Sequence, residues 1–246
     1  MNGFRNRSQA AFGCLALECI AEQLTQTNAG MVADIDTLTL VEMNDEASVV
    51  FHREPRDWML FNKILNRQTQ AKPRSHGNYG PSIKAAQNII EQELDRLEDI
   101  DSEDLPGFAL ILLADGKPSD KDILAKSNRI RDIMNISSRL KEKFSFFAMG
   151  LGADGSDFTV LETLSCTVKE CGGIGEFNHA GLSAANIGNS FSQIASSIST
   201  MRSRLLSKID SDVQKDETKP VIPLKQRKSF AKTKDDSIQK VTNNVE

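Results

Sequence analysis

Residues 108–120 read FALILLADGKPSD, and this stretch decides how the chain is expected to fold. The apolar run of residues 108–114 is typical of a parallel strand that helices cover on both faces. The run ends at Asp115 and Gly116, and a Lys-Pro-Ser-Asp turn follows. Because ligands of open α/β sheets bind beyond the carboxyl ends of the strands, Asp115 is expected at the mouth of a cleft.

On either side of this strand, strand patterns and helix patterns alternate along the chain. We expect further strands at residues 36–43, 47–53, 143–150 and 174–180, and helices at 8–28, 56–68, 81–99, 120–142, 157–168 and 182–207. The first two strands read as a hairpin, which makes one edge strand antiparallel. The sequence therefore predicts an α/β fold with a doubly wound, mostly parallel sheet and helices on both faces.

Local patterns refine this prediction. Ser8 stands where a cap of the first helix is expected. The helix at residues 56–68 has an apolar inner face made of Trp58, Leu60, Phe61, Ile64 and Leu65. Residues 208–246 contain dense charge and few large apolar side chains, so we expect a folded domain at 1–207 and a disordered charged tail after it. KQRKSF in this tail resembles a basic-directed phosphorylation site at Ser229, although a solvated tail without such a role is the better interpretation.

Composition excludes several classes of protein. The chain has 246 residues, 39% of them hydrophobic, and 34 acidic residues are intermixed with 30 basic ones. This balance gives no basic field for nucleic acid, and no apolar run approaches the ~20 residues of a membrane helix. Glu18 interrupts an N-terminal run that mimics a secretory signal, so a buried first helix is favoured and a cytoplasmic location is expected. The four cysteines form two C-x4-C pairs, a spacing unlike that of zinc sites, and are interpreted as free thiols: Cys14, Cys19, Cys166 and Cys171.

Three loops are predicted to meet at the carboxyl edge of the sheet: residues 75–81, 114–120 and 150–157. They are rich in Gly, Ser, Asn and Asp, which suit close approach and oxygen coordination of a hard cation such as Mg²⁺. Asp115 is the best placed carboxylate, and the alternative is that it caps the helix that follows. The residues assigned to ligand binding in these loops are Gly77, Asn78, Lys117 and Asp154.

Residues 150–155, GLGADG, match the G-x-G-x-x-G pattern of dinucleotide-binding loops. This match leaves a Rossmann-like nucleotide-binding enzyme open as an alternative function. Against it, the motif lies in the second half of the chain, and Ser156 and Asp157 place the helix start beyond the third glycine. His52, His76 and His179 form no pattern typical of catalysis, and we expect no enzyme activity.

The hairpin, SHGNYGPSIKAAQNII, LILLADGKPSD and FSFFAMGLGADG together resemble the von Willebrand factor type A domain, also called the integrin inserted domain. The resemblance covers about residues 1–206. It implies a doubly wound sheet with one antiparallel edge strand and a metal-ion-dependent adhesion site at the top of the sheet. In the family, that site combines a D-x-S-x-S motif after the central strand, a threonine before the third helix and an aspartate after the fourth strand.

Asp115 matches the aspartate of this family site. Gly77 stands where the threonine is usual, and Ser75 is a substitute whose register differs by two residues. The D-x-S-x-S motif and the central strand between residues 36–43 and 108–114 are absent, since Met1 corresponds to the methionine that follows the family's serines. Each buried backbone group left unpaired by a missing strand costs about 1–3 kcal/mol. We therefore expect either a truncated product of a longer protein or a degenerate domain whose neighbouring strands close up.

The expected function is that of a protein–protein interaction module with a partial metal site. In a complete site, a partner's acidic side chain would complete the coordination of the cation. In this chain we expect Mg²⁺ to bind weakly or not at all, and the partner to contact the three loops. A third alternative is a regulatory fragment of a larger signalling protein.

Overall fold

The computed structural model describes residues 6–28, 36–71, 77–101 and 105–217 of the chain. The chain divides into two compact units, Met1–Ile209 and Asp210–Glu246. All the strands and the core clusters belong to the first unit.

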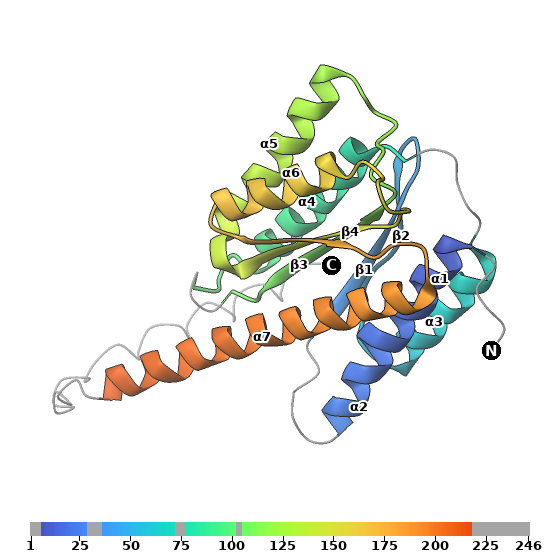
Figure 1. Ribbon diagram of the computed structural model, residues 1–246. Helices are drawn as coiled ribbons and strands as arrows, with labels where there is room; N and C mark the ends of the chain where they lie inside the picture. Colours follow the sequence, from blue (N-terminus) through green and yellow to red (C-terminus); the bar gives the residue numbers. More distant parts are fainter. Residues whose placement is uncertain (1–5, 29–35, 72–76, 102–104, 218–246) are drawn as a thin grey trace, which may run out of the picture. The chain divides into compact units, whose positions relative to one another are not determined.

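Three of the predicted strands form a parallel sheet (Figure 1). They are β3 (Phe108–Ala114), β4 (Phe144–Gly150) and β5 (Ile174–His179), hydrogen-bonded in the order β3-β4-β5. Helix α5 (Ile123–Leu140) joins β3 to β4, and α6 (Thr159–Glu170) joins β4 to β5. A single turn of 3-10 helix lies between α5 and β4. The predicted alternation of strands and helices is confirmed in this part of the chain.

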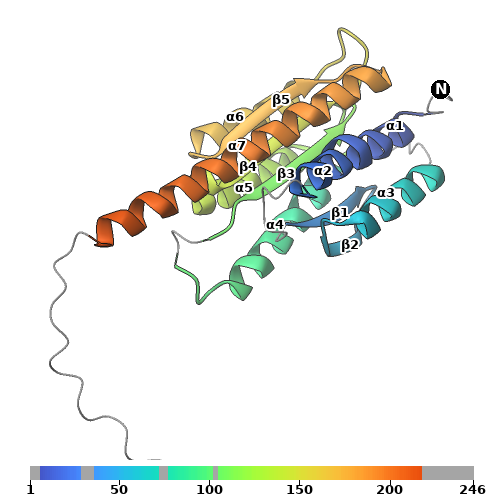
Figure 2. The same cartoon turned by 90° about the horizontal axis from the view of Figure 1, so that it is seen from below.

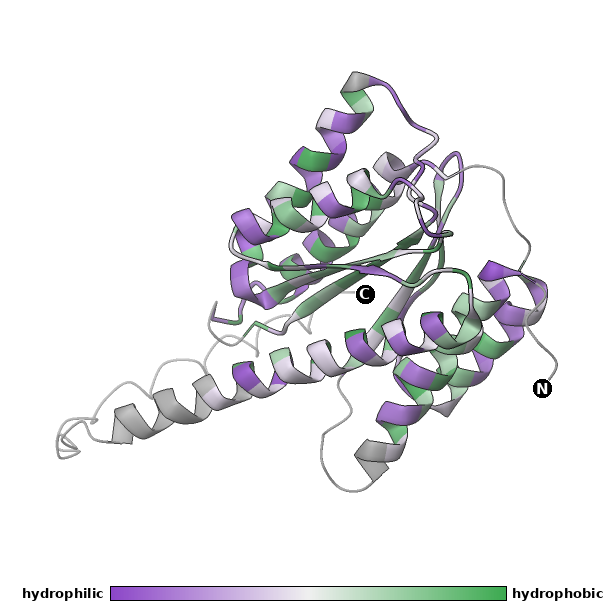
Figure 3. Ribbon diagram, viewed as in Figure 1, coloured by the Kyte–Doolittle hydropathy of each residue, from purple (hydrophilic) through white to green (hydrophobic). Residues whose placement is uncertain are grey.

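Helices cover both faces of the parallel sheet, and β4 shows how the side chains divide between them. Every residue of β4 is buried. Phe146 points into a cluster with α4 (Tyr79–Arg96), α5 and α6. Its neighbour Phe147 points into a second cluster with α1 (Arg7–Cys14) and α7 (Ala184–Glu217). Figure 3 shows the hydrophobic colour concentrated along the strands and on the sheet-facing sides of the helices.

The predicted hairpin forms a separate two-stranded sheet, with β1 (Thr37–Met43) antiparallel to β2 (Ala47–Pro55). It packs with α3 (Trp58–Gln70) and with the N-terminal helix, which continues from α1 through a π-helical segment, Leu15–Ala21, into α2 (Glu22–Asn28). The predicted buried first helix is confirmed. The buried side chains of this cluster are Ala16, Ile20, Leu24, Leu60 and Ile64.

The sequence predicts one continuous sheet, but the described strands form two separate sheets. Among the described strands, β1 pairs only with β2, and β3 pairs on one side only, with β4 (Figure 2). β1 and β3 do not pair with each other. The alternative of a degenerate domain whose neighbouring strands close up is therefore wrong on this point. A cleft remains between β1 and β3, and both strands line it.

Two local predictions are corrected. Helical spacing predicts Trp58 on the inner face of α3, but this side chain is 48% exposed. Asp57 caps α3 by accepting from the Leu60 backbone N–H at 2.8 Å, so Trp58 is the first helical residue and lies beyond the cluster. In α1, Asn6 and not Ser8 is the cap, and its side chain accepts from the backbone N–H at position 9 at 2.9 Å.

Helix α7 continues to Glu217, past residue 207, after which the sequence predicts a disordered tail. Lysine, glutamine and glutamate in this stretch have high helix propensity, which favours continuation over disorder. Residues 218–246, including Ser229, lie outside the described residues.

None of the helices in the described ranges combines the length and the apolar composition that crossing a membrane requires.

We expect Gly175→Ala to destabilise the fold strongly. A Cβ at Gly175 in β5 would lie 2.0 Å from the Ser165 carbonyl oxygen in α6, so strand and helix would have to separate. Overpacking of this kind typically costs about 1–3 kcal/mol. Gly188→Ala in α7 is the matched control, because its Cβ would meet nothing nearer than 3.6 Å and alanine favours a helix. Urea unfolding of both variants checks this, and equal stabilities would contradict the packing argument.

Candidate functional site at the carboxyl edge of the parallel sheet

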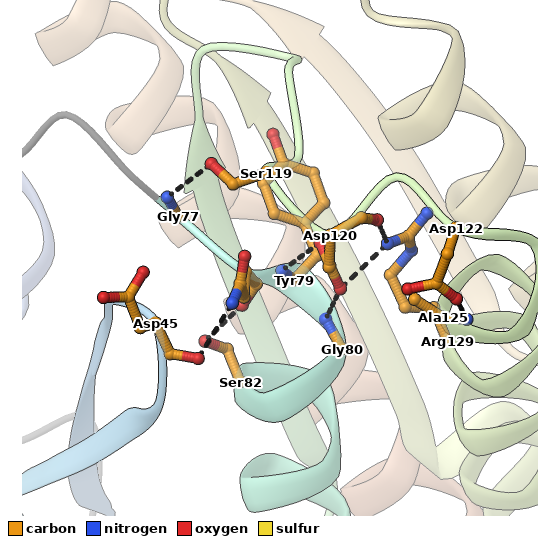
Figure 4. A network of polar contacts seen from close by, with 11 residues as sticks. Asp45, Gly77, Tyr79, Gly80, Ser82, Ser119, Asp120, Asp122, Ala125 and Arg129 are labelled. Atoms are coloured by element: carbon orange, nitrogen blue, oxygen red, sulfur yellow. Dashed lines mark hydrogen bonds and ion pairs between the residues drawn. The ribbon is translucent and has the colours of Figure 1, made fainter.

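Hydrogen bonds between backbone and side chains tie the loops at the carboxyl edge together (Figure 4). The Gly77 N–H donates to the Ser119 hydroxyl at 3.2 Å, and the Ser119 N–H donates to the Gly77 carbonyl at 3.0 Å. The Leu151 N–H donates to the Ala114 carbonyl at 2.8 Å, which joins the third loop to the end of β3. The predicted meeting of the three loops is therefore present in the described residues of each.

Asp120 fixes the start of α4 from a different loop. Its carboxylate oxygens accept from the N–H groups of Tyr79 at 3.0 Å and Gly80 at 2.8 Å. The same carboxylate forms an ion pair with Arg129 at 2.9 Å, and the two side chains are only 11% and 4% exposed. Arg129 also donates to the Asp120 carbonyl at 2.6 Å. Asp120 thus supplies the helix cap that Asn78, whose side chain points to the hairpin, does not provide.

Two more acids at this edge accept hydrogen bonds from backbone N–H groups at the starts of the helices that follow them. Asp122 accepts from the Ala125 N–H at 2.6 Å at the start of α5. Asp157 accepts from the Thr159 N–H at 3.0 Å at the start of α6. Hydrogen bonds from the backbone and side chain of Thr159 lower the pKa of Asp157 below its ordinary value. Because carboxylates near helix N-termini are stabilising, both acids serve the fold itself.

Asp115 is exposed like Asp122 and Asp157, but the N–H group that it bonds belongs to its own loop and not to a helix. It accepts from the Lys117 backbone N–H at 3.1 Å. The alternative that Asp115 caps the following helix is wrong, since Asp122 does so. Gly116 makes the turn with a φ of +86°, and a Cβ there would lie 2.2 Å from the Asp157 carbonyl oxygen. The turn that presents Asp115 is therefore packed tightly against the third loop.

Asp115 lies at a cavity of about 720 Å³ at this edge, which we name the carboxyl-edge cavity. Lys117 and Arg7 line it as well, so the cavity carries one acidic and two basic side chains. The other lining residues come from the start of α1, the third loop and the region before α7: Asn6, Ala10, Gly152, Ala153, Ser156, Leu182 and Ala184. Sequence reasoning missed the contribution of Asn6 and Arg7, which carry no motif. Arg7 donates to the Leu151 carbonyl at 2.7 Å, and this bond attaches α1 to the third loop.

The other predicted ligand-binding residues are placed differently. Asn78 faces the hairpin and bonds the Asp45 carbonyl at 2.9 Å, and Gly77 is bonded to Ser119. Asp154 is exposed on the third loop and does not line the carboxyl-edge cavity. Ser75, the predicted second metal ligand, lies outside the described residues. Asp115 and Lys117 are thus the predicted residues that the structure brings together.

Tyr79 lies beneath these loops at the start of α4 and is 1% exposed. Its buried hydroxyl oxygen has no hydrogen-bond partner among the described residues. Burial raises the pKa of Tyr79 well above its ordinary value, and the negative charge of Asp115 raises it further. The Gly116 N–H lies close enough to lower this pKa in part, without the geometry of a formed hydrogen bond. No local pattern in the sequence indicates that this hydroxyl stands unpartnered.

The described residues around Asp115 do not fit a divalent cation. Mg²⁺ takes near-octahedral oxygen ligands. The neighbouring carboxylates of Asp120 and Asp157 are already committed to helix N–H groups, and the Ser119 hydroxyl accepts from Gly77. Within the described ranges, no group of three or more His, Cys, Asp or Glu side chains is arranged to hold a metal ion.

The glycine-rich loop is unlike a phosphate-binding loop in one respect. The start of α6, where a phosphate would be attracted, is occupied by the Asp157 carboxylate. His179 lies nearby, but its ring is bonded to the Gly152 carbonyl at 2.9 Å and packs on Phe158. His52 lies on the exposed hairpin, as predicted, and His76 lies outside the described residues.

The predicted free thiols are confirmed. Cys14 and Cys19 are buried between the N-terminal helix and α7, where their thiols face the carbonyls of Ala184 and Phe191. Burial raises the pKa of Cys14, and raises that of Cys19 to about 12. Both thiols therefore stay protonated at neutral pH and behave as core residues.

A scan against protein-family models found no match to the chain, and a search of curated proteins found none either. The resemblance to the von Willebrand factor type A domain therefore rests on the sequence motifs themselves.

We expect Asp120→Ala to lower the free energy of unfolding by about 3 kcal/mol, because it leaves the buried Arg129 charge and two helix N–H groups without their carboxylate. Asp115→Ala, five residues earlier in the same turn, should change it by less than about 0.5 kcal/mol, since Asp115 is exposed. Chemical denaturation of the two variants measures both values. Similar losses of unfolding free energy in Asp120→Ala and Asp115→Ala would show that Asp115 supports the fold as much as Asp120 does, and would contradict this prediction.

Asp157 should make the fold sensitive to acid. Its pKa is lowered in the folded chain, so its charged form stabilises the fold above the unfolded pKa of about 3.9, and this contribution disappears as pH falls through the folded value. In Asp157→Asn the contribution is absent at every pH. Thermal unfolding midpoints of the two proteins should therefore differ at neutral pH and converge under strongly acidic conditions. A difference that stays constant with pH would contradict this.

Proposed function

We propose that the chain is a non-enzymatic protein-interaction module of the von Willebrand factor type A kind, which binds its partner through the carboxyl-edge cavity. The observation that carries the proposal is the contrast among the acids at this edge. Asp120, Asp122 and Asp157 are bonded to N–H groups at helix N-termini, whereas the Asp115 carboxylate lines the cavity and accepts only from the backbone N–H of Lys117 among the described residues. Loops that hydrogen bonds hold in place around the Asp115 carboxylate suit the recognition of a protein partner.

The doubly wound arrangement of that family belongs to this proposal, with the described strands divided between two sheets. Its support is the parallel order β3-β4-β5 with helices packed on both faces, and the antiparallel hairpin beside it. The position of Asp115 at the end of β3 agrees with the position of the family's third metal-site residue.

The partner's chemistry follows from the surroundings of Asp115. The family resemblance implies an acidic partner side chain held through a cation. Among the described residues, no group of acidic, histidine or cysteine side chains is arranged to hold a cation beside Asp115. We therefore favour direct contact between Asp115 and the partner. A basic side chain or backbone N–H groups of the partner would donate hydrogen bonds to this carboxylate. Lys117, at the same cavity, offers a complementary site for an acceptor on the partner.

The nucleotide-binding enzyme remains the less favoured alternative. The Asp157 carboxylate at the start of α6 would repel a phosphate at the position where the glycine motif should bind it. No observation in the described residues favours this function over recognition of a protein.

The proposed function predicts that Asp115→Arg abolishes partner binding without unfolding the chain. The substitution reverses the charge at the cavity, where it would repel a basic partner group. Asp99→Arg is the matched control, because Asp99 is an exposed acid beyond the far end of α4, at the opposite edge. The measurement is quantitative mass spectrometry of proteins cross-linked to a photoreactive residue at position 153, an exposed position that lines the cavity, in each background. Cross-linked proteins that are lost in Asp115→Arg and kept in Asp99→Arg support the proposal. The same cross-linked proteins in both variants would refute it.

A millimolar Mg²⁺ titration completes the test. We expect the unfolding midpoint to stay unchanged in the wild-type chain, because the donors around Asp115 do not converge. A rise that Asp115→Ala removes would instead assign a working metal site to this edge, and direct partner contact would then be wrong.

A further inference from the structure

Arg7 lines the carboxyl-edge cavity with a guanidinium group that is held in place but has no charge partner. Arg7 is the first residue of α1, and its Nη1 group donates to the Leu151 carbonyl at 2.7 Å. A guanidinium is planar and carries five N–H donors, so this bond restricts its orientation and leaves most of its donors unused. No acid of the described ranges forms an ion pair with Arg7.

Most of the other described arginines do have a charge partner. Ion pairs with Asp or Glu are formed by Arg53, Arg56, Arg67, Arg96, Arg129, Arg131 and Arg202. Arg139 is exposed at the end of α5, forms no ion pair with a described acid and lines neither the carboxyl-edge cavity nor the cleft between β1 and β3. Arg7 differs from all of these because it faces a cavity without a carboxylate to pair with.

The charges around the cavity leave room for one more negative group. The Lys117 ammonium also lines the cavity and forms no ion pair with a described acid. Asp115 is the one acidic residue of the lining, and its carboxylate accepts from the backbone of Lys117 without pairing with either cation. The lining therefore carries one more positive charge than negative charge. A bound monoanion would balance it.

The undescribed residues that adjoin this edge in the sequence do not supply that anion. Residues 1–5 precede Asn6, which lines the cavity, and residues 72–76 precede Gly77 in the first loop. The two stretches read MNGFR and KPRSH, and neither contains an acidic side chain. Both would add positive charge to the edge. The missing negative charge has to come from another molecule or from a distant part of the chain.

A carboxylate suits these groups better than a phosphate does. Two parallel N–H groups of a guanidinium match the two oxygens of a carboxylate. One carboxylate also balances the excess charge of the lining. A phosphate carries a charge of about −1.5 to −2, which would exceed that balance and would lie beside the Asp115 carboxylate. The cavity therefore favours an acidic side chain.

We propose that Arg7 selects the partner of the carboxyl-edge cavity by binding the carboxylate of an acidic partner side chain. Lys117 attracts the same negative charge from the turn after β3. This inference rests on the proposed function, because it adds an acidic residue to the partner group that donates to Asp115. The partner then presents an acidic and a basic residue side by side. A partner with basic residues alone meets two unpaired cations and is rejected.

The test uses the full chain and short peptides with blocked ends. The first peptide, Gly-Lys-Glu-Lys-Gly, places a carboxylate between two basic residues, and the matched control, Gly-Lys-Gln-Lys-Gly, removes only the charge of that carboxylate. The Nε–H signal of Arg7 in nuclear magnetic resonance spectra, assigned by its loss in Arg7→Lys, reports binding directly. We expect a saturable shift with the first peptide and an affinity lower by about tenfold or more with the control. Equal affinities, or no shift with either peptide, would overturn the proposal.

The Nε–H signal of Arg139 is the control for unspecific attraction of the peptide. Because Arg139 is exposed and has no described charge partner, it should respond to a carboxylate only weakly and without saturation. Equal saturable shifts at Arg7 and Arg139 would show that any exposed arginine binds the peptide, and would overturn the proposal.

Two variants separate this inference from the proposed function. In Arg7→Gln, affinity for the Glu peptide, followed by the backbone amide signals of the third loop, should fall to that of the Gln peptide. Arg7→Lys should restore part of it, because lysine keeps the charge and loses the paired N–H groups. Affinity that is lost in Asp115→Arg and unchanged in Arg7→Gln would overturn the role of Arg7 and leave the proposed function intact. Affinity unchanged in both variants would place the peptide elsewhere and contradict both proposals.

Two further outcomes would assign the site to another anion. A peptide with phosphoserine in place of Glu that binds more tightly than the Glu peptide would make phosphate the preferred group. Binding that appears only after Asp235 and Asp236 are changed to Asn would show that acids of this chain already occupy the site. Either result would overturn the proposal of an acidic partner side chain.

Discussion

The carboxylate of Asp120 fixes the start of α4, and the rest of the fold depends on α4 because this helix contacts both sheets. Its side chains join the core cluster of the parallel sheet, and it also packs on β1 and β2. No hydrogen-bond ladder joins the two sheets among the described strands, so helix packing has to do so. Asp120 bonds two N–H groups of α4 and the buried Arg129 of α5 at once. One side chain therefore sets the position of α4 relative to the turn after β3.

Much of this arrangement follows from the sequence, for identifiable reasons. The apolar run at 108–114 and the alternating strand and helix patterns predict β3, β4, β5 and their connecting helices, because buried parallel strands leave a strong local signal. Asp115 can be identified from the sequence because an acid directly after such a run marks the carboxyl end of a buried strand. Asp120 cannot, because its partners, Tyr79, Gly80 and Arg129, lie on two other elements. A capping acid supplied from a distant loop has no local sequence pattern.

The remaining errors have the same origin. The inner-face assignment of Trp58 uses helical spacing alone, but a residue in the first turn can lie beyond the cluster that the rest of the helix covers. The spacing of apolar residues shows which of them can lie on the same face of a helix. It does not show how far along that helix the neighbouring element extends. Likewise, the strand patterns of β1 and β3 predict strands correctly, but whether those strands pair depends on what lies between them.

The carboxyl-edge cavity and the cleft between β1 and β3 share part of their lining. Asn6, Arg7, Asp115 and Lys117 line both. The Ser119–Gly77 and Arg7–Leu151 bonds hold the loops of this shared rim together. A ligand in the cavity would therefore meet a rim whose shape is fixed by hydrogen bonds, so recognition there depends on the side chains of Arg7, Asp115 and Lys117 and not on movement of the loops.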